Sequence, residues 1–366
     1  MRKSMHPRRA AAAVMLAALL AVAGLAACGG GDAGSSGGLP GSGASSTIVG
    51  AGASFPYPLY SKWGSEYNNL NGVKLNYQSI GSGGGISAIS AKTVDFGASD
   101  APLESAELDE AGLMQWPQCV GGVVMVVNLE GIQTNQLKLT GELIAKMYGG
   151  DIKDWEDPAI AAVNEGLEIP SGKINVVHRS DSSGTTWIFT SYLDAAAHDV
   201  WTFGGEKEIA WPTGVGGKGN EGVAASVQQL KGSIGYVEYA YAKETGLVTT
   251  QLQNADGEWV EPSLESFGEA AAQADWADAE DFNMVLVDQP GPETWPITGA
   301  SFIMVQKEQA DAARAQTMLQ FFEWAFTDGA AAAESLDYVP IPESVSTLIK
   351  AEWETITAAG EPVWPL

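Results

Sequence analysis

The sequence predicts an α/β fold, and three observations support that prediction. One scheme repeats along the chain: a strand-like segment, a turn rich in Gly and Ser, and then a segment with apolar residues at helical spacing. With 366 residues, the chain is long enough for two ordinary domains. Its hydrophobic fraction of 45%, including 12 Trp, is enough for sizeable cores. Ligands of α/β sheets bind beyond the carboxyl ends of the strands, so we expect a site there.

The N-terminus has the pattern of an export signal that precedes a lipidated cysteine. A basic start is followed by an apolar stretch over residues 10–27. The stretch ends in Leu25-Ala26-Ala27-Cys28, which resembles a bacterial lipoprotein cleavage box, so we expect removal of residues 1–27 and lipidation of Cys28. An apolar run of about 18 residues is also long enough for a transmembrane anchor. The Gly- and Ser-rich residues 28–46 favour the lipoprotein, because they suit a flexible tether between a membrane and a domain. We therefore expect the protein outside the cytoplasm, in the periplasm or on the cell surface, anchored by lipid to a bacterial membrane.

The globular part begins near Thr47. Residues 48–52 are predicted to form a strand that runs into a Gly turn, after which Ser54 can cap a helix. Tyr60, Trp63 and Tyr67 recur at helical spacing, as expected for a stripe that faces the core. The other predicted elements are strands at 73–80, 94–100, 120–128, 174–178, 232–237 and 301–306, helices from Ile86, within 139–154 and over 309–325, and a polar segment without a clear period at 250–295.

The chain is strongly acidic, which excludes several classes of partner. Its formal net charge is −26, whereas nucleic acids and anionic membrane surfaces attract a basic face. By itself, such acidity indicates only solubility or a salty habitat. Any anion site must rely on local, desolvated donors, because the long-range field repels anions. The histidines His6, His178 and His198 lack zinc-site spacing, and Cys28 and Cys119 are not expected to pair. We therefore expect no metal and no cofactor.

The run HRSDSSGTTW, residues 178–187, is the strongest candidate for an anion site. Arg179 offers a guanidinium, Ser183 and Thr185 offer hydroxyls, and Gly184 opens the backbone at the predicted first turn of a helix. The unpaired N–H groups and the positive end of the dipole at a helix start favour an oxyanion. Asp181 is placed to hold the guanidinium, although a surface turn residue needs no such role.

Three further polar positions follow predicted strands. Ser54-Phe55, Ser82 and Asp100 lie where a strand gives way to a turn or helix, so they could converge with Arg179 on one cleft. Each alone is weak evidence, because a Ser at a helix start is usually a cap and Asp100 could cap the turn before Pro102. Asp100 would repel a fully deprotonated anion, but it can accept the proton that phosphate carries near neutral pH and sulfate lacks. We therefore expect Asp100 to select phosphate over sulfate.

Two apparent motifs do not indicate other sites. Gly214-x-Gly216-x-x-Gly219 matches a dinucleotide-binding pattern, but it follows Trp-Pro-Thr rather than a clear strand and lacks the acidic residue further on. Lys218 is likewise not followed by the Ser or Thr of a phosphate loop. The serine-hydrolase pattern occurs only at residues 34–38, inside the predicted tether.

Several long runs resemble the phosphate-specific substrate-binding proteins of bacterial ABC phosphate importers. These runs are GAGASFPYPLYSKW, YQSIGSGGG, TVDFGASDAPL, HRSDSSGTT, GKGNEGVAASVQQLKGSIGYVEYAYAK and WPITGASFI, between Ile48 and the region of Pro342. The resemblance implies a two-lobed α/β periplasmic-binding-protein fold of type II, with inorganic phosphate held in a cleft between the lobes. It also implies a monomer that is not an enzyme and that delivers phosphate to the membrane subunits of an ABC permease.

The same resemblance implies which residues contact phosphate. These contacts fall on Ser54, Phe55, Ser82, Asp100, Arg179, Ser183, Gly184 and Thr185, with Asp181 pairing with the arginine. The family often has Thr where this chain has Ser54, and Ser keeps the hydroxyl. Residues 155–170 and 250–290 match the family less well. We expect one lobe to hold residues 47–123 and 297–366 and the other to hold 124–296, with the apolar run at 120–128 and the strand at 301–306 crossing between them.

Two other classes of function remain as alternatives. A phosphatase could use Ser82 or Ser183 as a nucleophile, but the sequence offers no nearby base except His178 and no cluster of metal ligands. A scaffold or adhesin could display a disused anion pocket on the cell surface. Turnover of a phosphate ester would identify the enzyme, and the absence of a phosphate-dependent Trp fluorescence change would identify the scaffold.

Overall fold

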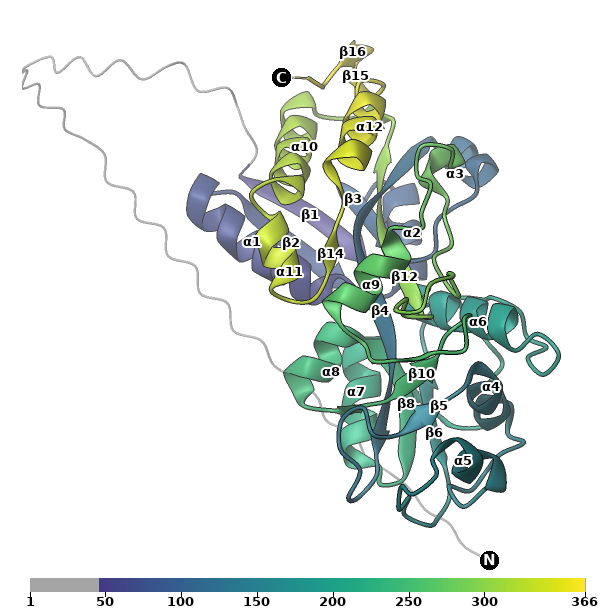
Figure 1. Ribbon diagram of the computed structural model, residues 1–366. Coiled ribbons are helices and arrows are strands. Elements are labelled where there is room, and N and C mark those ends of the chain that lie inside the picture. Colours follow the sequence, from purple (N-terminus) through teal and green to yellow (C-terminus); the bar gives the residue numbers. More distant parts are fainter. Residues whose placement is uncertain (1–45, 366) are drawn as a thin grey trace, which may run out of the picture. The chain divides into compact units, whose positions relative to one another are not determined.

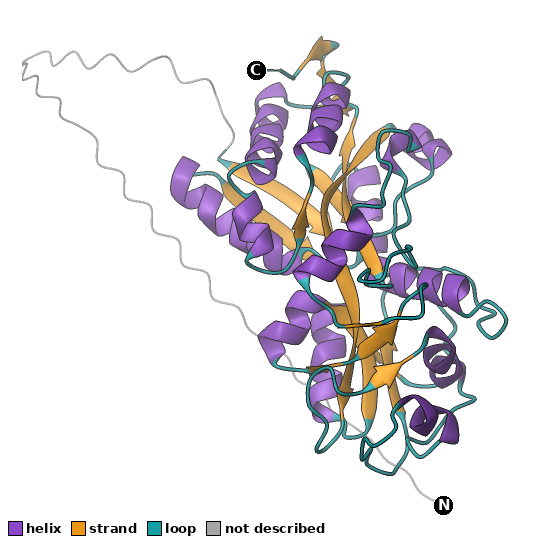
Figure 2. Ribbon diagram, in the orientation of Figure 1, coloured by secondary structure: helices purple, strands orange, loops and turns teal. Residues whose placement is uncertain are grey.

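The computed structural model describes residues 46–365. The predicted signal at 1–27, the lipidation site Cys28 and all but the last residue of the tether lie outside the described residues. Within the described part, no helix has both the length and the apolar character needed to span a bilayer. Helices and strands alternate along this part of the chain, and the predicted α/β class is confirmed (Figures 1 and 2).

The helices flank a central sheet. Their bounds are α1 (Tyr57–Asn71), α2 (Ser82–Ser90), α3 (Ser105–Ala111), α4 (Gly141–Gly149), α5 (Pro158–Val163), α6 (Gly184–Ala196), α7 (Gly219–Gln229), α8 (Tyr239–Thr245), α9 (Leu264–Ala271), α10 (Ala312–Phe326), α11 (Ala330–Glu334) and α12 (Glu343–Trp353), with a 3₁₀ turn at Glu280–Phe282.

The central sheet of the described residues has ten strands. Its main path runs β2 (Lys74–Ser79), β1 (Thr47–Gly52), β3 (Phe96–Ser99), β12 (Thr298–Gln306), β4 (Leu113–Asn128), β8 (Ser233–Glu238), β6 (Asn175–Arg179) and β7 (Val215–Gly217), while β9 (Val248–Thr249) and β14 (Val339–Pro340) also pair with β4. Two small sheets join β5 (Lys138–Leu139), β10 (Gln251–Gln253) and β11 (Trp259–Val260), and β13 (Glu308–Gln309), β15 (Thr357–Ala358) and β16 (Glu361–Pro362).

Strand β4 forms the middle of the sheet and changes partner halfway along its length. It pairs antiparallel with β12 from Leu113 to Gly122 and with β8 from Val123 to Asn128. Glycine is required at the change of partner, because a Cβ on Gly122 would lie 2.1 Å from the Phe267 ring. The strand thus divides the sheet into one set with β1, β2, β3 and β12 and another with β6, β7 and β8.

The directions of these strands bring the predicted loops to the site. Strand β1 runs parallel to β2 and β3, so the carboxyl ends of all three meet at one edge. Strand β6 likewise runs parallel to β7 and β8, so their carboxyl ends meet at another. Ser54, Ser82 and Asp100 follow strands of the first set, and Arg179 ends a strand of the second.

Aromatic rings fill the core on both sides of β4. The predicted stripe of Tyr60, Trp63 and Tyr67 on α1 is buried, which confirms its assignment to the core. In the second set, Phe189 stacks on Tyr236 with ring centroids 4.2 Å apart. The helices that begin at polar site residues therefore pack into the core through apolar residues of their later turns.

Three predictions of secondary structure were wrong in extent. Strand β4 begins at Leu113 rather than at residue 120, because buried glutamines interrupt the apolar pattern; Gln115, for example, bonds the main chain of Leu103 at 2.8 and 2.9 Å. Helix α2 begins at Ser82 rather than at Ile86, so Gly83, Gly84 and Gly85 lie inside the helix. The segment 250–295, predicted to lack a clear period, contains β10, β11 and α9.

Candidate functional site

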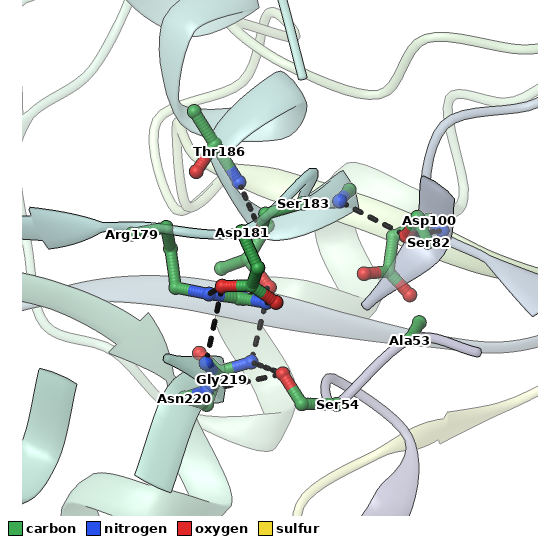
Figure 3. A network of polar contacts seen from close by, with 12 residues as sticks. Ala53, Ser54, Ser82, Asp100, Arg179, Asp181, Ser183, Thr186, Gly219 and Asn220 are labelled. Carbon is green, nitrogen blue, oxygen red and sulfur yellow. Dashed lines mark hydrogen bonds and ion pairs between the residues drawn. The ribbon is translucent and has the colours of Figure 1, made fainter. Parts of the chain in front are cut away.

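The structure brings the predicted site residues together. Ser54, Ser82, Asp100, Arg179, Ser183, Gly184 and Thr185 form one cluster between the two sets of strands, and each is almost completely buried. Figure 3 shows Arg179, Asp181, Asn220 and Ser54 in one network of polar contacts, with Ser82 and Asp100 beside the residues that follow Ser183. The two sets of loops contact each other directly through hydrogen bonds.

Helix α6 begins at Gly184, as predicted. The Ser183 side chain caps the helix by accepting a hydrogen bond from the Thr186 N–H at 3.1 Å. The Gly184 N–H donates across the site to the Ser82 hydroxyl at 2.9 Å. Only glycine permits this approach, since a Cβ on Gly184 would lie 2.6 Å from both Ser82 Oγ and Asp100 N.

Arg179 is a buried cation whose orientation is fixed. Its Nε and Nη2 donate to the two carboxylate oxygens of Asp181 at 2.8 and 2.6 Å, and its Nη1 donates to Thr185 Oγ1 at 3.2 Å. Burial alone would raise the pKa of Asp181, but the hydrogen bonds and charge of Arg179 lower it, so this carboxyl stays ionised. A guanidinium has five N–H donors, and the two that these bonds leave over are available to an anion.

Asp100 is the acidic member of the site. Its side chain is buried, and its Oδ1 accepts a hydrogen bond from Ser301 Oγ at 2.8 Å. Burial raises the pKa of Asp100 to about 7, against the opposing effects of Ser301 and Arg179. Selection of a protonated anion requires the ionised carboxylate, which accepts the ligand's proton in a hydrogen bond, and Ser301 and Arg179 favour that form.

A second buried carboxyl, Glu238, was not found from the sequence. The Ala240 N–H contacts both of its oxygens at 3.0 Å, and burial raises the pKa of Glu238 to about 8. The Tyr338 hydroxyl lies 2.8 Å from Glu238 Oε2 and 2.7 Å from the Phe55 carbonyl. Burial thus favours the neutral form of Glu238, whereas the hydrogen bonds from Ala240 and Tyr338 favour its carboxylate.

Phe55, a predicted phosphate contact, has its side chain in the core. Its ring is fully buried and packs edge-on against Tyr338, with centroids 6.1 Å apart. The aromatic side chain therefore anchors the turn that carries Ser54, and it belongs to the core rather than to the polar cluster.

Asn220 is a site residue that the sequence analysis missed. It is completely buried at the start of α7, where its main-chain and side-chain N–H groups both donate to Ser54 Oγ, at 3.0 and 2.9 Å. The neighbouring Gly219 N–H donates to Asp181 Oδ1 at 3.1 Å. The signal was the run of glycines from Gly214 to Gly219. No strand directly precedes this run, as predicted, but β7 lies inside it, and the glycines bring the start of α7 up to the site.

The contacts of His178 do not match those of a catalytic base. Its ring stacks on Trp211, and its Nδ1 lies 2.9 Å from the Arg179 carbonyl oxygen rather than next to a serine hydroxyl. Burial lowers the pKa of His178. Within residues 46–365, no three or more His, Cys, Asp or Glu side chains gather as a metal site would require, and Cys119 is a buried free thiol.

Comparison with known proteins places the chain in a family. A family model described as the PBP superfamily domain matches residues 38–329. The phosphate-binding protein PstS of Xylella fastidiosa (strain 9a5c) is 53% identical over 307 residues, which cover 84% of each chain. The phosphate-binding protein PstS of Pasteurella multocida (strain Pm70) is 51% identical over 322 residues, covering 87% of this chain and 93% of its own.

A solved structure shows that the fold is shared more widely. The phosphate-binding protein of Stenotrophomonas maltophilia superposes with a TM-score of 0.67 at 20% identity, covering 84% of this chain and 94% of its own. The predicted type II periplasmic-binding-protein fold is thereby confirmed. By its sequence and its architecture, this chain belongs to the PBP superfamily and, within it, to the family of PstS phosphate-binding proteins.

Proposed function

We propose that this protein captures inorganic phosphate outside the cytoplasm and delivers it to the membrane subunits of an ABC import permease. The curated relatives in its family are named as phosphate-binding proteins. The observation that carries the proposal is the placement of buried Asp100 among the donors of Arg179 and α6. One acceptor among many donors fits an anion that still carries a proton, which phosphate does near neutral pH and sulfate does not.

The contacts proposed for phosphate are those of the buried cluster. Arg179 supplies charge-assisted N–H donors, and Ser183, Gly184 and Thr185 lie at the start of α6, where the helix dipole favours an anion. Ser54, Phe55, Ser82 and Asp100 complete the site from the first set of strands. Asp181 supports the site by fixing Arg179. The role is binding rather than catalysis, with neither a cofactor nor a metal.

We also propose that the cluster lies at the junction of two lobes that close on the ligand. One lobe would hold residues 47–123 and 297–366, and the other 124–296. In support, β4 changes partner between Gly122 and Val123, and the Val123 N–H bonds the Ile297 carbonyl at 2.8 Å. The chain would thus pass between the lobes at two adjacent places, near Val123 and near Ile297, and such a pair of connections is suited to a hinge.

If the lobes move as proposed, phosphate should make the molecule more compact in solution. Small-angle X-ray scattering of the ligand-free protein should give a larger radius of gyration than the protein saturated with phosphate, because closure shortens the particle. Indistinguishable scattering curves, with binding verified in the same sample, would contradict the hinge and leave the binding site untouched.

A lipid on Cys28 is the proposed means of attachment to a bacterial membrane. The cleavage-box pattern and the adjoining tether support it. Cys28→Ser should shift the protein from the membrane fraction to the soluble fraction, or leave it uncleaved with its signal attached. Mass spectrometry of the membrane-bound parent should show Cys28 as a lipidated first residue; an unmodified Cys28 in that fraction would refute the proposal.

Arg179→Ala is the direct test of phosphate binding by this cluster. Truncating one partner of a buried, hydrogen-bonded charge pair costs about 2–5 kcal/mol, so phosphate affinity should fall by well over tenfold. Arg314→Ala is a matched control, because Arg314 makes an ion pair with Asp95 on a partly exposed surface and should leave affinity unchanged. Isothermal titration of both variants, with circular dichroism to verify folding, decides the matter. A folded Arg179→Ala protein with the parent's affinity would exclude this site.

A further inference from the structure

We propose that Asn220 is a positioning residue that forces the hydroxyls of Ser54 and Thr185 to act as hydrogen-bond donors toward the bound anion. The inference rests on the proposed function and extends it to a residue that determines the direction of the hydrogen bonds between these hydroxyls and the anion. Asn220 is completely buried, so water does not compete for its hydrogen bonds. Its side chain links a loop of the first set of strands with a helix that follows the second.

The orientation of the Asn220 amide is determined by a main-chain group. Its Oδ1 accepts a hydrogen bond from the Glu238 N–H at 2.9 Å, and only the oxygen of an amide can accept. The Nδ2 group must therefore face the other way. Its two protons point to Ser54 Oγ at 2.9 Å and to Thr185 Oγ1 at 3.0 Å. Every hydrogen-bonding atom of the side chain is thus paired.

Each of the two hydroxyls receives a second donor, which uses up its capacity to accept. Ser54 Oγ also accepts from the Asn220 main-chain N–H at 3.0 Å, and Thr185 Oγ1 also accepts from Arg179 Nη1 at 3.2 Å. A hydroxyl has two acceptor lone pairs and one proton. With both lone pairs engaged, the proton of each hydroxyl is directed away from these donors. Within residues 46–365, neither hydroxyl donates a hydrogen bond to the protein, so each proton is free for a ligand.

The Ser82 hydroxyl also accepts two hydrogen bonds from the protein, but from main-chain donors. Its Oγ accepts from the Gly184 and Asp100 N–H groups at 2.9 and 3.3 Å, so its proton is also left over. Main-chain groups fix this hydroxyl, whereas Ser54 and Thr185 depend on one side chain. Substitution of Asn220 should therefore change two of the three donors and spare the third.

Asn220 could act by orienting the hydroxyl protons of Ser54 and Thr185 or only by stabilising the fold, and the two roles have different consequences. Without the amide, Ser54 and Thr185 each regain a free lone pair, and their protons can rotate away from the anion. A structural role would lower stability equally whether or not the two hydroxyls are present. An orienting role disappears when the hydroxyls are removed, so a double-mutant cycle distinguishes the two.

The test is isothermal titration with inorganic phosphate across that cycle. Asn220→Ala should weaken phosphate binding roughly 10- to 100-fold, as expected when buried hydrogen-bonding groups lose their partner. In a Ser54→Ala, Thr185→Val background, the same substitution should change affinity by less than about threefold. Asn220→Leu keeps the approximate shape of the side chain without its amide or a new charge, and it replaces Asn220→Ala in the cycle if that variant does not fold.

Asn164→Ala is the matched control. Asn164 is also buried, with its Nδ2 donating to the carbonyls of Lys138 and Ile160 and its Oδ1 accepting from the Lys138 N–H. This variant should lower the melting temperature and leave phosphate affinity unchanged. Parent-like affinity of Asn220→Ala, or equal losses in both backgrounds, overturns the positioning role. A parent protein that does not bind phosphate at all instead rejects the proposed function itself.

Discussion

The requirement to bury an anion inside an acidic protein governs the rest of this structure. A formal net charge of −26 repels phosphate at long range, so the favourable free energy must come from donors fixed within the site. Arg179 is the only Arg or Lys among the buried residues of the described part, and Asp181 fixes its direction with two hydrogen bonds. Burial raises the pKa of both Glu238 and Asp100, and Asp100 is the one that lies beside the start of α6. The chain thus combines one oriented cation with one tunable acceptor.

The same contacts that shape the site also join the two sets of strands. Gly184 N–H bonds Ser82, and Asn220 bonds Ser54, so residues from both sides share hydrogen bonds in the closed form. Tyr241 adds a third link, because its hydroxyl donates to the Ser54 carbonyl at 2.6 Å. If the lobes close as proposed, closure and completion of the donor set occur together, and a ligand that binds the closed form better shifts the equilibrium toward it.

Local chemistry was readable from the sequence, whereas long-range pairing was not. The Ser-Gly-Thr run predicted a helix start, and α6 begins at Gly184. Asp181 was recognised as the partner of Arg179 because the two are only two residues apart. Asn220 escaped notice since its partners, Ser54 and Thr185, are 166 and 35 residues away, and no local pattern shows such a contact. The early start of β4 was missed for a related reason. Its buried Gln115 bonds main-chain atoms of Leu103 and Asp281, so a polar residue in this strand is not an exposed one.

The central claim is that Asp100 selects a protonated anion, and competition between phosphate and sulfate tests it most directly. Titration at neutral pH should show tight binding of phosphate and little binding of sulfate by the parent protein. Asp100→Asn keeps the shape, removes the charge and adds a donor, so it should bind sulfate measurably better while losing less of its phosphate affinity. An Asn variant that rejects sulfate as strongly as the parent would contradict the claim and place selectivity in the shape of the cleft and its other donors.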